Sequence, residues 1–331
     1  MLLLAGDIGG TKTTLAVFSK ERGLRDPLAE ATFPSTDYDS LETIALTFMS
    51  QLERSIDEVD RACFGVAGPV IDGHSKITNL PWAMSETQLS QKLELRTAKL
   101  VNDLESIAYS VPILEGGDLH TLNEGQPVKG GSIAILAPGT GLGEGYLTWD
   151  GERYNAYGSE GGHGDFAPTN ALQLGLLRHL QEKFGHVSSE RVCSGMGVPN
   201  IYHYLKETGY AQEPPWLTKK LAEVDDPTPI IINTALNQHD ASELCDATLD
   251  IFVSIIGSEA GNLGLTILST GGMYLGGGIP RRILPALESS TFKESFHSKG
   301  RMSDLLEKMP VHVILNTKAA LLGAARYGLE M

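Results

Sequence analysis

The chain has 331 residues, of which 41% are hydrophobic and 20% charged, values typical of a globular protein of about two domains. Its net charge of −15 argues against nucleic acid or an anionic membrane as a partner, since both are negatively charged. Three scattered cysteines, Cys63, Cys193 and Cys245, match no zinc-binding spacing and favour a reducing cytoplasm over a disulfide framework. The N-terminal apolar run is too short for a signal peptide, and the polar residues within 249–268 favour a buried helix over a membrane span.

The first element is a predicted β-hairpin, formed by two apolar runs at 2–5 and 15–18 around a turn rich in glycine. Gly9 and Gly10 allow the backbone to approach a ligand closely, and the exposed N–H groups of such a turn suit phosphate. Asp7, just before the turn, is placed to bind a metal ion that neutralises that phosphate. The alternative is an ordinary hairpin turn with a surface aspartate.

Two better-known phosphate motifs are excluded for this stretch. A P-loop needs a glycine at the sixth position, and counting from Gly6 that position is Thr11. A P-loop also leads into a helix, whereas residues 14–18 favour a strand. The dinucleotide fingerprint is absent as well, which leaves a phosphate-binding hairpin.

The remainder of the first half alternates between strands and helices. The expected strands are 28–33, 62–68 and 99–101, and the expected helices are 40–56, a segment that starts at Ser85, and 104–109. The pattern then starts again, because an apolar run at 131–137 ends in the glycine-rich segment 138–143 and strand character resumes at 146–148. Two such units indicate an internal duplication.

The second half contains more helix than the first. The expected helices are 171–184, 198–207, 242–268, 282–287 and 318–329, and the expected strands are 275–279, with its glycine-rich end, and 311–315. Two phosphate turns that face each other would hold a polyphosphate between two domains.

Seven short motifs, in order, carry a resemblance to bacterial glucokinases, which belong to the actin-like ATPase and hexokinase superfamily. These motifs are Asp7-Ile8-Gly9-Gly10-Thr11, Thr78-Asn79 with Trp82, Leu100-Val101-Asn102-Asp103, Gly139-Thr140-Gly141-Leu142-Gly143, Glu160-Gly161-Gly162-His163, Ser189-Glu190-Arg191-Val192 and Gly276-Gly277-Gly278. The resemblance runs from about Leu4 to the last helix. It implies an α/β, two-domain actin-like ATPase (ribonuclease H-like) fold, with a mixed sheet flanked by helices in each domain. The small domain would comprise residues 1–111 plus 316–331, and the large domain, with helical insertions, residues 112–315.

Asp103 is the candidate catalytic base. It follows a strand, where α/β folds place active residues, and a carboxylate there can accept the proton of a sugar hydroxyl that attacks the γ-phosphate. The residues alone fit a helix N-cap equally well. The resemblance favours the base.

The resemblance also implies a sugar site and a nucleotide site. The implied sugar-binding residues are Asn79, Asn102, Asp103, Glu160, His163 and Glu190. Carboxylates and amides suit adjacent hydroxyls, although Glu190 alone fits a solvated helix residue and Asn79 a turn former. The implied nucleotide-binding residues are Asp7, Gly9, Gly10, Thr11, Gly139, Thr140, Gly141, Gly276, Gly277 and Gly278. Asp7 would hold Mg²⁺ with the ATP. Lys12 replaces an asparagine common at this place in glucokinases and is left without a role.

No zinc is expected. Related repressor/kinase (ROK-type) sugar kinases bind structural zinc through a cysteine cluster after a similar glycine–histidine segment, and here the segment 164–168 contains no cysteine. The implied activity is ATP-dependent phosphorylation of glucose at its 6-hydroxyl in the cytoplasm, by a homodimer. The alternatives are a kinase for mannose or N-acetylmannosamine and a non-catalytic sugar sensor.

Overall fold

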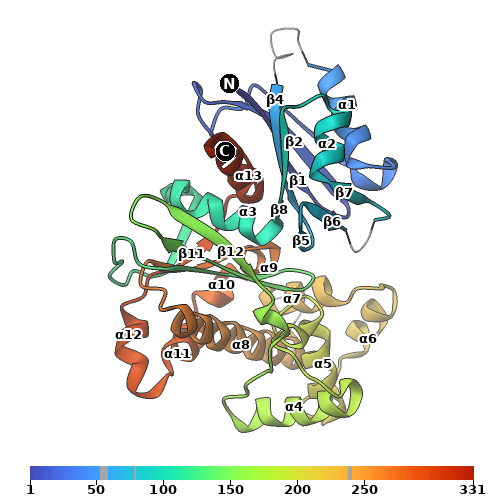
Figure 1. Ribbon diagram of the computed structural model, residues 1–331. Coiled ribbons are helices and arrows are strands. Elements are labelled where there is room, and N and C mark those ends of the chain that lie inside the picture. Colours follow the sequence, from blue (N-terminus) through green and yellow to red (C-terminus); the bar gives the residue numbers. More distant parts are fainter. Residues whose placement is uncertain (53–58, 78–79, 238–240) are drawn as a thin grey trace. The chain divides into compact units, whose positions relative to one another are not determined.

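The computed structural model describes residues 1–52, 59–77, 80–237 and 241–331, and the chain folds into two compact units (Figure 1). The first unit comprises residues 1–116, 152–158 and 316–331, and the second comprises 117–151 and 159–315. Within the described residues, no helix combines the length and the apolar character that a membrane crossing requires.

The first unit is built on a five-stranded mixed sheet in the order β3-β2-β1-β4-β8. Its strands are β1 (Leu2–Ile8), β2 (Lys12–Ser19), β3 (Ala29–Pro34), β4 (Val59–Val66) and β8 (Thr97–Asn102). The predicted hairpin is confirmed, since β1 and β2 pair antiparallel up to Ile8 opposite Thr13. β1, β4 and β8 run parallel, so their carboxyl ends meet at one edge of the sheet.

Helices cover both faces of this sheet, because successive side chains along a strand point to opposite faces and both sets are apolar. α1 (Leu41–Ser50) and α2 (Glu86–Lys92) bury one face, which includes Leu4 and Phe64. The C-terminal helix α13 (Ala319–Glu330) buries the other face, which includes Leu3 and Cys63, and it packs against α3 (Asp103–Ser110). The core therefore fixes the sheet edge where Asp7 and Asp103 stand.

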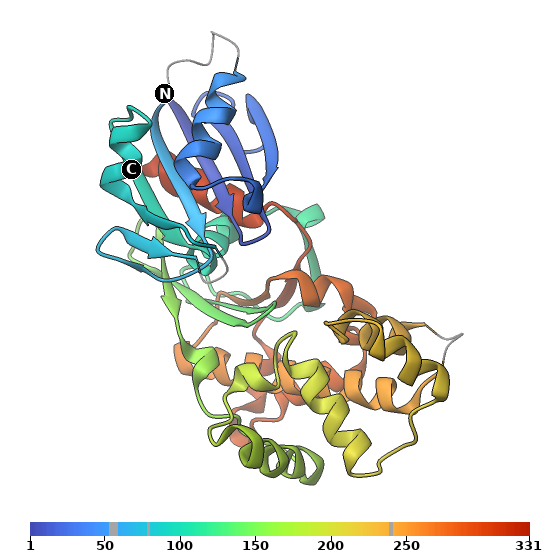
Figure 2. The same cartoon turned by 90° about the vertical axis from the view of Figure 1, so that its right-hand side faces the viewer.

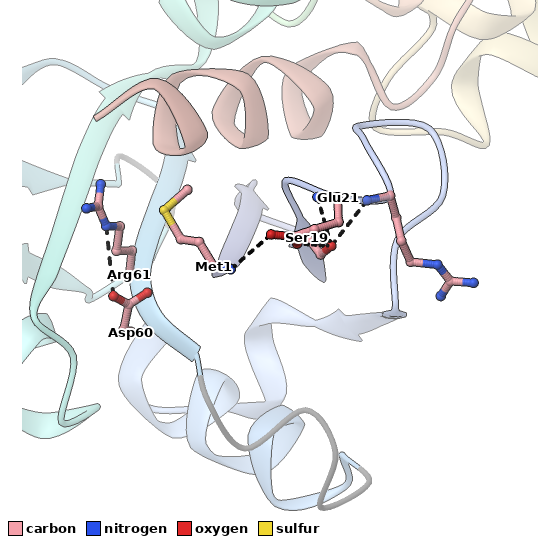
Figure 3. Close-up of polar contacts among 6 residues, drawn as sticks. Met1, Ser19, Glu21, Asp60 and Arg61 are labelled. Carbon is pink, nitrogen blue, oxygen red and sulfur yellow. Dashed lines mark hydrogen bonds and ion pairs between the residues drawn. The ribbon is translucent and has the colours of Figure 1, made fainter.

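Polar contacts close the opposite end of the hairpin, away from the turn. The N-terminal amine lies 3.4 Å from the Glu21 carboxylate, which also accepts a 2.7 Å hydrogen bond from the Ser19 hydroxyl (Figure 3). Arg61 lies beside Asp60 and donates to the carbonyl of Met331 at 2.6 Å, which ties the end of the chain to β4. A small antiparallel sheet adjoins α2 and consists of β5 (Val70–Ile71), β6 (His74–Lys76) and β7 (Ala83–Ser85).

The six-stranded sheet repeats the strand order of the first sheet, and all its strands except β12 belong to the second unit. Its order is β12-β11-β10-β13-β14-β9, from β9 (Leu119–Asn123), β10 (Ile133–Pro138), β11 (Leu142–Trp149), β12 (Tyr154–Ser159), β13 (Gly272–Leu275) and β14 (Val311–Ile314). β10 and β11 form an antiparallel hairpin, and β10, β13 and β14 run parallel, as β1, β4 and β8 do. The predicted duplication is thus visible in the topology, to which β9 adds an antiparallel edge strand.

Helices account for most of the regular secondary structure of the second unit, and α8 (Glu243–Ile267) is at its centre. α5 (Gly197–Glu207), α7 (Thr228–Leu236) and α11 (Ser290–His297) pack against it, and α4 (Ala171–Phe184) packs on α5 (Figure 2). The remaining helices are α6 (Pro215–Ala222), α9 (Gly278–Arg282), α10 (Leu284–Leu287) and α12 (Ser303–Glu307).

Three predicted elements have the wrong bounds. The strand expected at 275–279 is β13, which ends at Leu275, and residues 278 and 279 belong to a helix instead. In place of a single helix over 282–287, the structure has α9 and α10, separated at Ile283. Each short helix has a proline, Pro280 or Pro285, in its first turn, where the missing N–H needs no intrahelical partner. The earlier start means that α9 begins directly at the glycine-rich segment. The predicted helix 40–56 ends at Ser50, and residues 53–58 lie outside the described ranges.

Candidate active site

The turn between β1 and β2 is held in shape by hydrogen bonds that leave its outer face open. The Gly9 N–H donates to the Lys12 carbonyl at 3.0 Å. The buried Ser35 braces the turn twice, since its hydroxyl donates to the Gly9 carbonyl at 2.8 Å and its N–H to the Thr11 carbonyl at 3.0 Å. Sequence reasoning missed Ser35, which lies more than twenty residues along the chain in no recognisable motif.

Asp7 stands near the carboxyl end of β1, next to this turn. It is partly buried, and burial raises the pKa of its carboxyl, an effect that the nearby positive charge of Lys12 opposes. A carboxylate beside open backbone N–H groups fits a hydrated Mg²⁺ that carries a polyphosphate. The side chain that the sequence left without a role therefore contributes positive charge at the metal-binding candidate.

Asn102, and not Asp103, is the N-cap of α3. Its side-chain oxygen accepts from the N–H groups of Leu104 and Glu105, and Glu105 completes a capping box. The Asn102 amide also donates to the Gly68 carbonyl at 3.0 Å, which leaves one N–H for a ligand. Because Asn102 caps the helix, Asp103 occupies its first turn, and the alternative of Asp103 as the N-cap is wrong.

The environment of Asp103 suits a proton acceptor near neutral pH. Burial and the negative charge of Asp7 raise the pKa of its carboxyl to about 6, against the lowering effect of a hydrogen bond from the Leu104 N–H. At pH 7 the group is mostly ionised, yet it is basic enough to take a proton from an attacking hydroxyl. The helix N-terminus behind it favours the charged form.

The turn between β10 and β11 is braced differently. The Gly139 N–H donates to the Gly141 carbonyl at 2.8 Å, and the Gly139 carbonyl accepts from the Gly195 N–H at 2.7 Å. The N–H of Leu142 donates to the Glu190 carboxylate at 3.0 Å. Glu190, expected to bind sugar, is thus anchored to the second turn by one oxygen.

The segment of Glu160 and His163 lies next to the same turn. The two side chains are exposed, with the Glu160 carboxylate 3.7 Å from the His163 ring, and the segment forms one 3-10 turn. Gly162 is required here, because a side chain would collide with the Leu142 carbonyl. The Gly164 carbonyl accepts from the Ser189 N–H at 2.9 Å, so the segments of Glu160, His163 and Glu190 are neighbours in the second unit.

The third glycine segment adjoins the second turn as well. The Gly276 N–H donates to the Leu136 carbonyl at 2.9 Å, and Gly277, with φ +84°, packs on the Pro138 carbonyl. A pocket of about 860 Å³ opens beside Gly139 and Thr140. Its further lining includes Met196, Pro199, Asn200, Leu221, Thr228 and Ile279. Mixed apolar and polar walls of this kind suit a planar base.

No clear sequence pattern marks this pocket, because most of its walls come from α5, α6, α7 and the connections between them. The nearest signal is the glycine-rich stretch 194–197, which was not used. Each unit thus gathers its own share of the predicted site residues. Asn79 lies outside the described residues. The described residues contain no group of three or more His, Cys, Asp or Glu that could hold a metal ion.

Comparison with known proteins gives a consistent result. The family model described as glucokinase matches residues 4–331. A curated glucokinase of Nostoc punctiforme is 40% identical over 338 residues, which cover 98% of this chain and 98% of that protein.

Solved structures agree with that match. The crystal structure of a glucokinase from an Antarctic psychrotroph superposes with a TM-score of 0.86 and 31% identity, and covers 100% of this chain and 99% of the other. A ROK-family glucokinase from Streptomyces griseus, solved with glucose and AMPPNP, shares the fold at a TM-score of 0.63, 19% identity and full coverage of both chains. The expected actin-like ATPase fold is therefore confirmed, and the chain belongs to the glucokinase family.

Proposed function

We propose that this protein transfers the γ-phosphoryl group of ATP to the 6-hydroxyl of D-glucose, giving glucose 6-phosphate and ADP, the first step of glycolysis. The observation that carries the proposal is the position of Asp103 together with the raised pKa of its carboxyl. Asn102 takes over the capping of α3, and a partly buried carboxylate with a pKa of about 6 stands at the carboxyl end of a parallel strand. A sugar sensor would have no use for such a base.

In the proposed reaction the Asp103 carboxylate accepts the proton of the 6-hydroxyl while that oxygen bonds to the γ-phosphorus. The bond between the γ-phosphorus and the β–γ bridging oxygen breaks, and ADP leaves with the bonding electrons. The base also orients the hydroxyl for in-line attack, which accounts for much of the catalysis of phosphoryl transfer.

The sugar hydroxyls would be bound by the side chains that surround these loops. In the first unit the remaining N–H of Asn102 is available, and Asn79 is proposed on the sequence motif alone. In the second unit Glu160 and His163 are exposed and Glu190 has a second oxygen to offer. Carboxylates that bridge adjacent hydroxyls would form charge-assisted bonds and give specificity.

The nucleotide would be held by backbone groups. The proposal assigns Gly9, Gly10 and Thr11 to the terminal phosphates from the first turn. It assigns Gly139, Thr140 and Gly141 to the phosphates from the second turn, and Gly276, Gly277 and Gly278 to the adenosine, whose base would enter the adjoining pocket. Asp7 would hold Mg²⁺, directly or through water, and the ion would neutralise charge on the transferred group.

The test is release of ADP in a coupled assay with ATP, Mg²⁺ and a panel of glucose, mannose and N-acetylmannosamine. We expect the highest kcat/KM with glucose. A higher value for mannose or N-acetylmannosamine would reassign the substrate, and sugar binding without turnover would support a sensor. We further propose a cytoplasmic homodimer without structural zinc. Light scattering on the purified protein tests the dimer, and stoichiometric zinc in an elemental analysis would contradict the last point.

A further inference from the structure

A polar stripe runs along the contact between β11 and α8 in the second unit. On β11 the alternating residues Glu144, Tyr146 and Thr148 face it, and on α8 the residues Glu259 and Asn262 are one turn apart. A helix that covers a sheet normally presents apolar side chains to it. Here the polar groups line a cavity of about 540 Å³, so the fold alone does not explain them.

Glu144 is the most buried acid in this cavity, with 4% of its surface exposed. The carboxyl of Glu259 lines the same cavity and interacts with that of Glu144, and one Glu144 oxygen, Oε1, has no hydrogen-bond partner among the described residues. Two carboxylates repel each other in a buried space, and a proton placed between them removes the repulsion and supplies a donor. The geometry therefore favours one proton held by the pair.

The same pair supports both candidate sugar segments. The second oxygen of Glu144 is in contact with Gly161, directly after Glu160. Burial raises the pKa of the Cys193 thiol, and the charges of Glu259 and Glu144 are close enough to raise it further. Cys193 lies three residues after Glu190 in a tight turn, where its N–H donates to the Ser189 carbonyl at 2.8 Å.

We propose that Glu144 and Glu259, sharing one proton, are positioning residues that hold segments 160–163 and 189–193 in the arrangement that binds glucose. The inference rests on the proposed function of those segments. When the proton is lost, two like charges face each other in a buried space, and the side chains must separate or draw in water. Gly161 lies against Glu144, so the displacement is passed directly to Glu160.

Among the groups in the cavity wall, this pair is the source of a charge change near neutral pH. The titratable His163 lies outside that wall, 3.7 Å from Glu160 in the same segment, and it is unchanged in the variants compared below. Burial and Glu259 raise the pKa of Glu144 from 4.5 to about 7. Lys299 is the cation nearby, and it remains tied to Asn262 at 2.7 Å and to the Ser258 carbonyl at 2.9 Å. The Cys193 thiol stays protonated because its pKa is raised well above its usual value. The other polar groups named in the cavity wall are hydroxyls and amides.

The expected signature is a KM for glucose that rises with pH, while the KM for ATP and kcat do not follow it. If only the protonated pair holds the segments correctly, the competent fraction falls to about one tenth one pH unit above a pKa of about 7. The KM for glucose should then rise up to about tenfold between about pH 6 and about pH 8.

The experiment measures this KM against pH in wild type, Glu144→Gln and Glu259→Gln. Glutamine keeps the shape and a hydrogen-bond donor but has no proton to lose, so both variants should hold the low-pH KM throughout. Dividing the KM of each variant by the wild-type KM at the same pH removes the effects of the other titrating groups, because these groups are the same in all three proteins. Glu42→Gln, at a glutamate that is 5% exposed and paired with Lys92 in the first unit, is the matched control and should retain the wild-type profile.

Profiles for both glutamine variants that parallel the wild type would overturn the inference, while the proposed function would stand as long as glucose is phosphorylated. Absence of glucose phosphorylation in the wild type would instead refute the proposed function. Circular dichroism checks that each variant folds, and one folded variant of the two is sufficient. A glucose Kd for the wild type that is equal at both pH values, by calorimetry, would overturn the inference without any variant.

Discussion

The two units carry the same hairpin on the same strand order but use it differently. In the first, the residue before the last of β1 is Asp7, and four residues separate the paired Ile8 and Thr13. In the second, the corresponding residue of β10 is Ala137, and three residues separate Pro138 from Leu142. The first turn thus has a carboxylate beside it and the second has none in that position.

The side chains that hold the two turns in shape differ in charge as well. The first is held by a serine hydroxyl, a neutral group that serves no ligand in the proposal. The second is held by the carboxylate of Glu190, which is also proposed to bind sugar. The first unit therefore concentrates reacting groups at its sheet edge, whereas the second links its phosphate turn to its sugar segment. Duplicated topology has been retained while the chemistry has diverged.

The largest effect is expected from Asp103→Ala, which removes the proposed base. We expect kcat to fall by a factor on the order of 10²–10⁴, because no other group takes the proton of the hydroxyl, while glucose still binds. Turnover is measured by ADP release and binding by calorimetry. Asp103→Asn should be equally inactive, and Asp39→Ala, an exposed aspartate of the same unit, should be unaffected. Turnover within a few-fold of wild type would remove Asp103 from the role.

The pH dependence of kcat/KM, which reports the groups of the free enzyme, tests how Asp7 and Asp103 interact. Asp103 must be ionised to act as a base, so kcat/KM should fall about tenfold per unit once the pH drops below a pKa of about 6. Asp7 raises that pKa through its negative charge, and Asp7→Asn should therefore shift the acidic limb to lower pH, whatever its effect on the maximum. A limb that does not move in this variant would contradict the assignment.

Hydrophobic pattern was sufficient for the hairpins, the parallel strands and the long helices, because each has a clear period or a glycine-marked end. It was insufficient where burial overrides local preference. Residues 230–232 are all isoleucine, which favours a strand, yet they lie in α7 because Ile231 and Ile232 are buried in the core around α8. The short strands β5, β6 and β7 have too few residues for any period to appear.

The features of the site likewise divide into those that the sequence predicts and those that it does not. Glycine motifs and strand ends predicted the two turns, since these features are local in sequence. The sequence alone does not show whether Asn102 or Asp103 is the N-cap of α3, because both residue types are good N-caps. The outcome depends on which side chain reaches the N–H of Glu105. The pair of Glu144 and Glu259 joins residues from opposite ends of the second unit, and the brace at Ser35 joins separate turns. Contacts of this kind follow from tertiary packing alone.

Glucose is expected to bring the two units into a more compact arrangement, because the proposed sugar residues are divided between them. A ligand held by both units favours the state in which both reach it. Glu160→Gln should weaken glucose binding about tenfold, since a charge-assisted hydrogen bond is worth roughly 1.5–3 kcal/mol and the amide keeps part of it. Small-angle scattering follows the radius of gyration. An unchanged wild-type radius at saturating glucose would exclude compaction, and unchanged affinity in the variant would exclude Glu160.

The smallest effect is expected from Ser35→Ala. This variant removes the serine hydroxyl that holds the first turn and leaves the Glu190 carboxylate that holds the second turn unchanged. Loss of the hydroxyl leaves the Gly9 carbonyl and the buried Thr13 hydroxyl, 3.0 Å away, without this partner. Such a loss costs about 1–3 kcal/mol, which lowers Tm by about 2–4 °C per kcal/mol in a domain of about 150–250 residues.

The functional consequence should fall on one substrate. A looser first turn should raise the KM for ATP a few-fold, because Gly9 is proposed to meet its phosphates, and the KM for glucose should not change. Ser50→Ala is the control, since its exposed hydroxyl donates only to a carbonyl of its own helix, that of Thr47. Glu190→Gln, at the charged brace, should raise both KM values, because that carboxylate holds the second turn and is proposed to bind sugar. If Ser35→Ala raised the KM for glucose as much as that for ATP, the proposed division of roles between the two turns would be wrong.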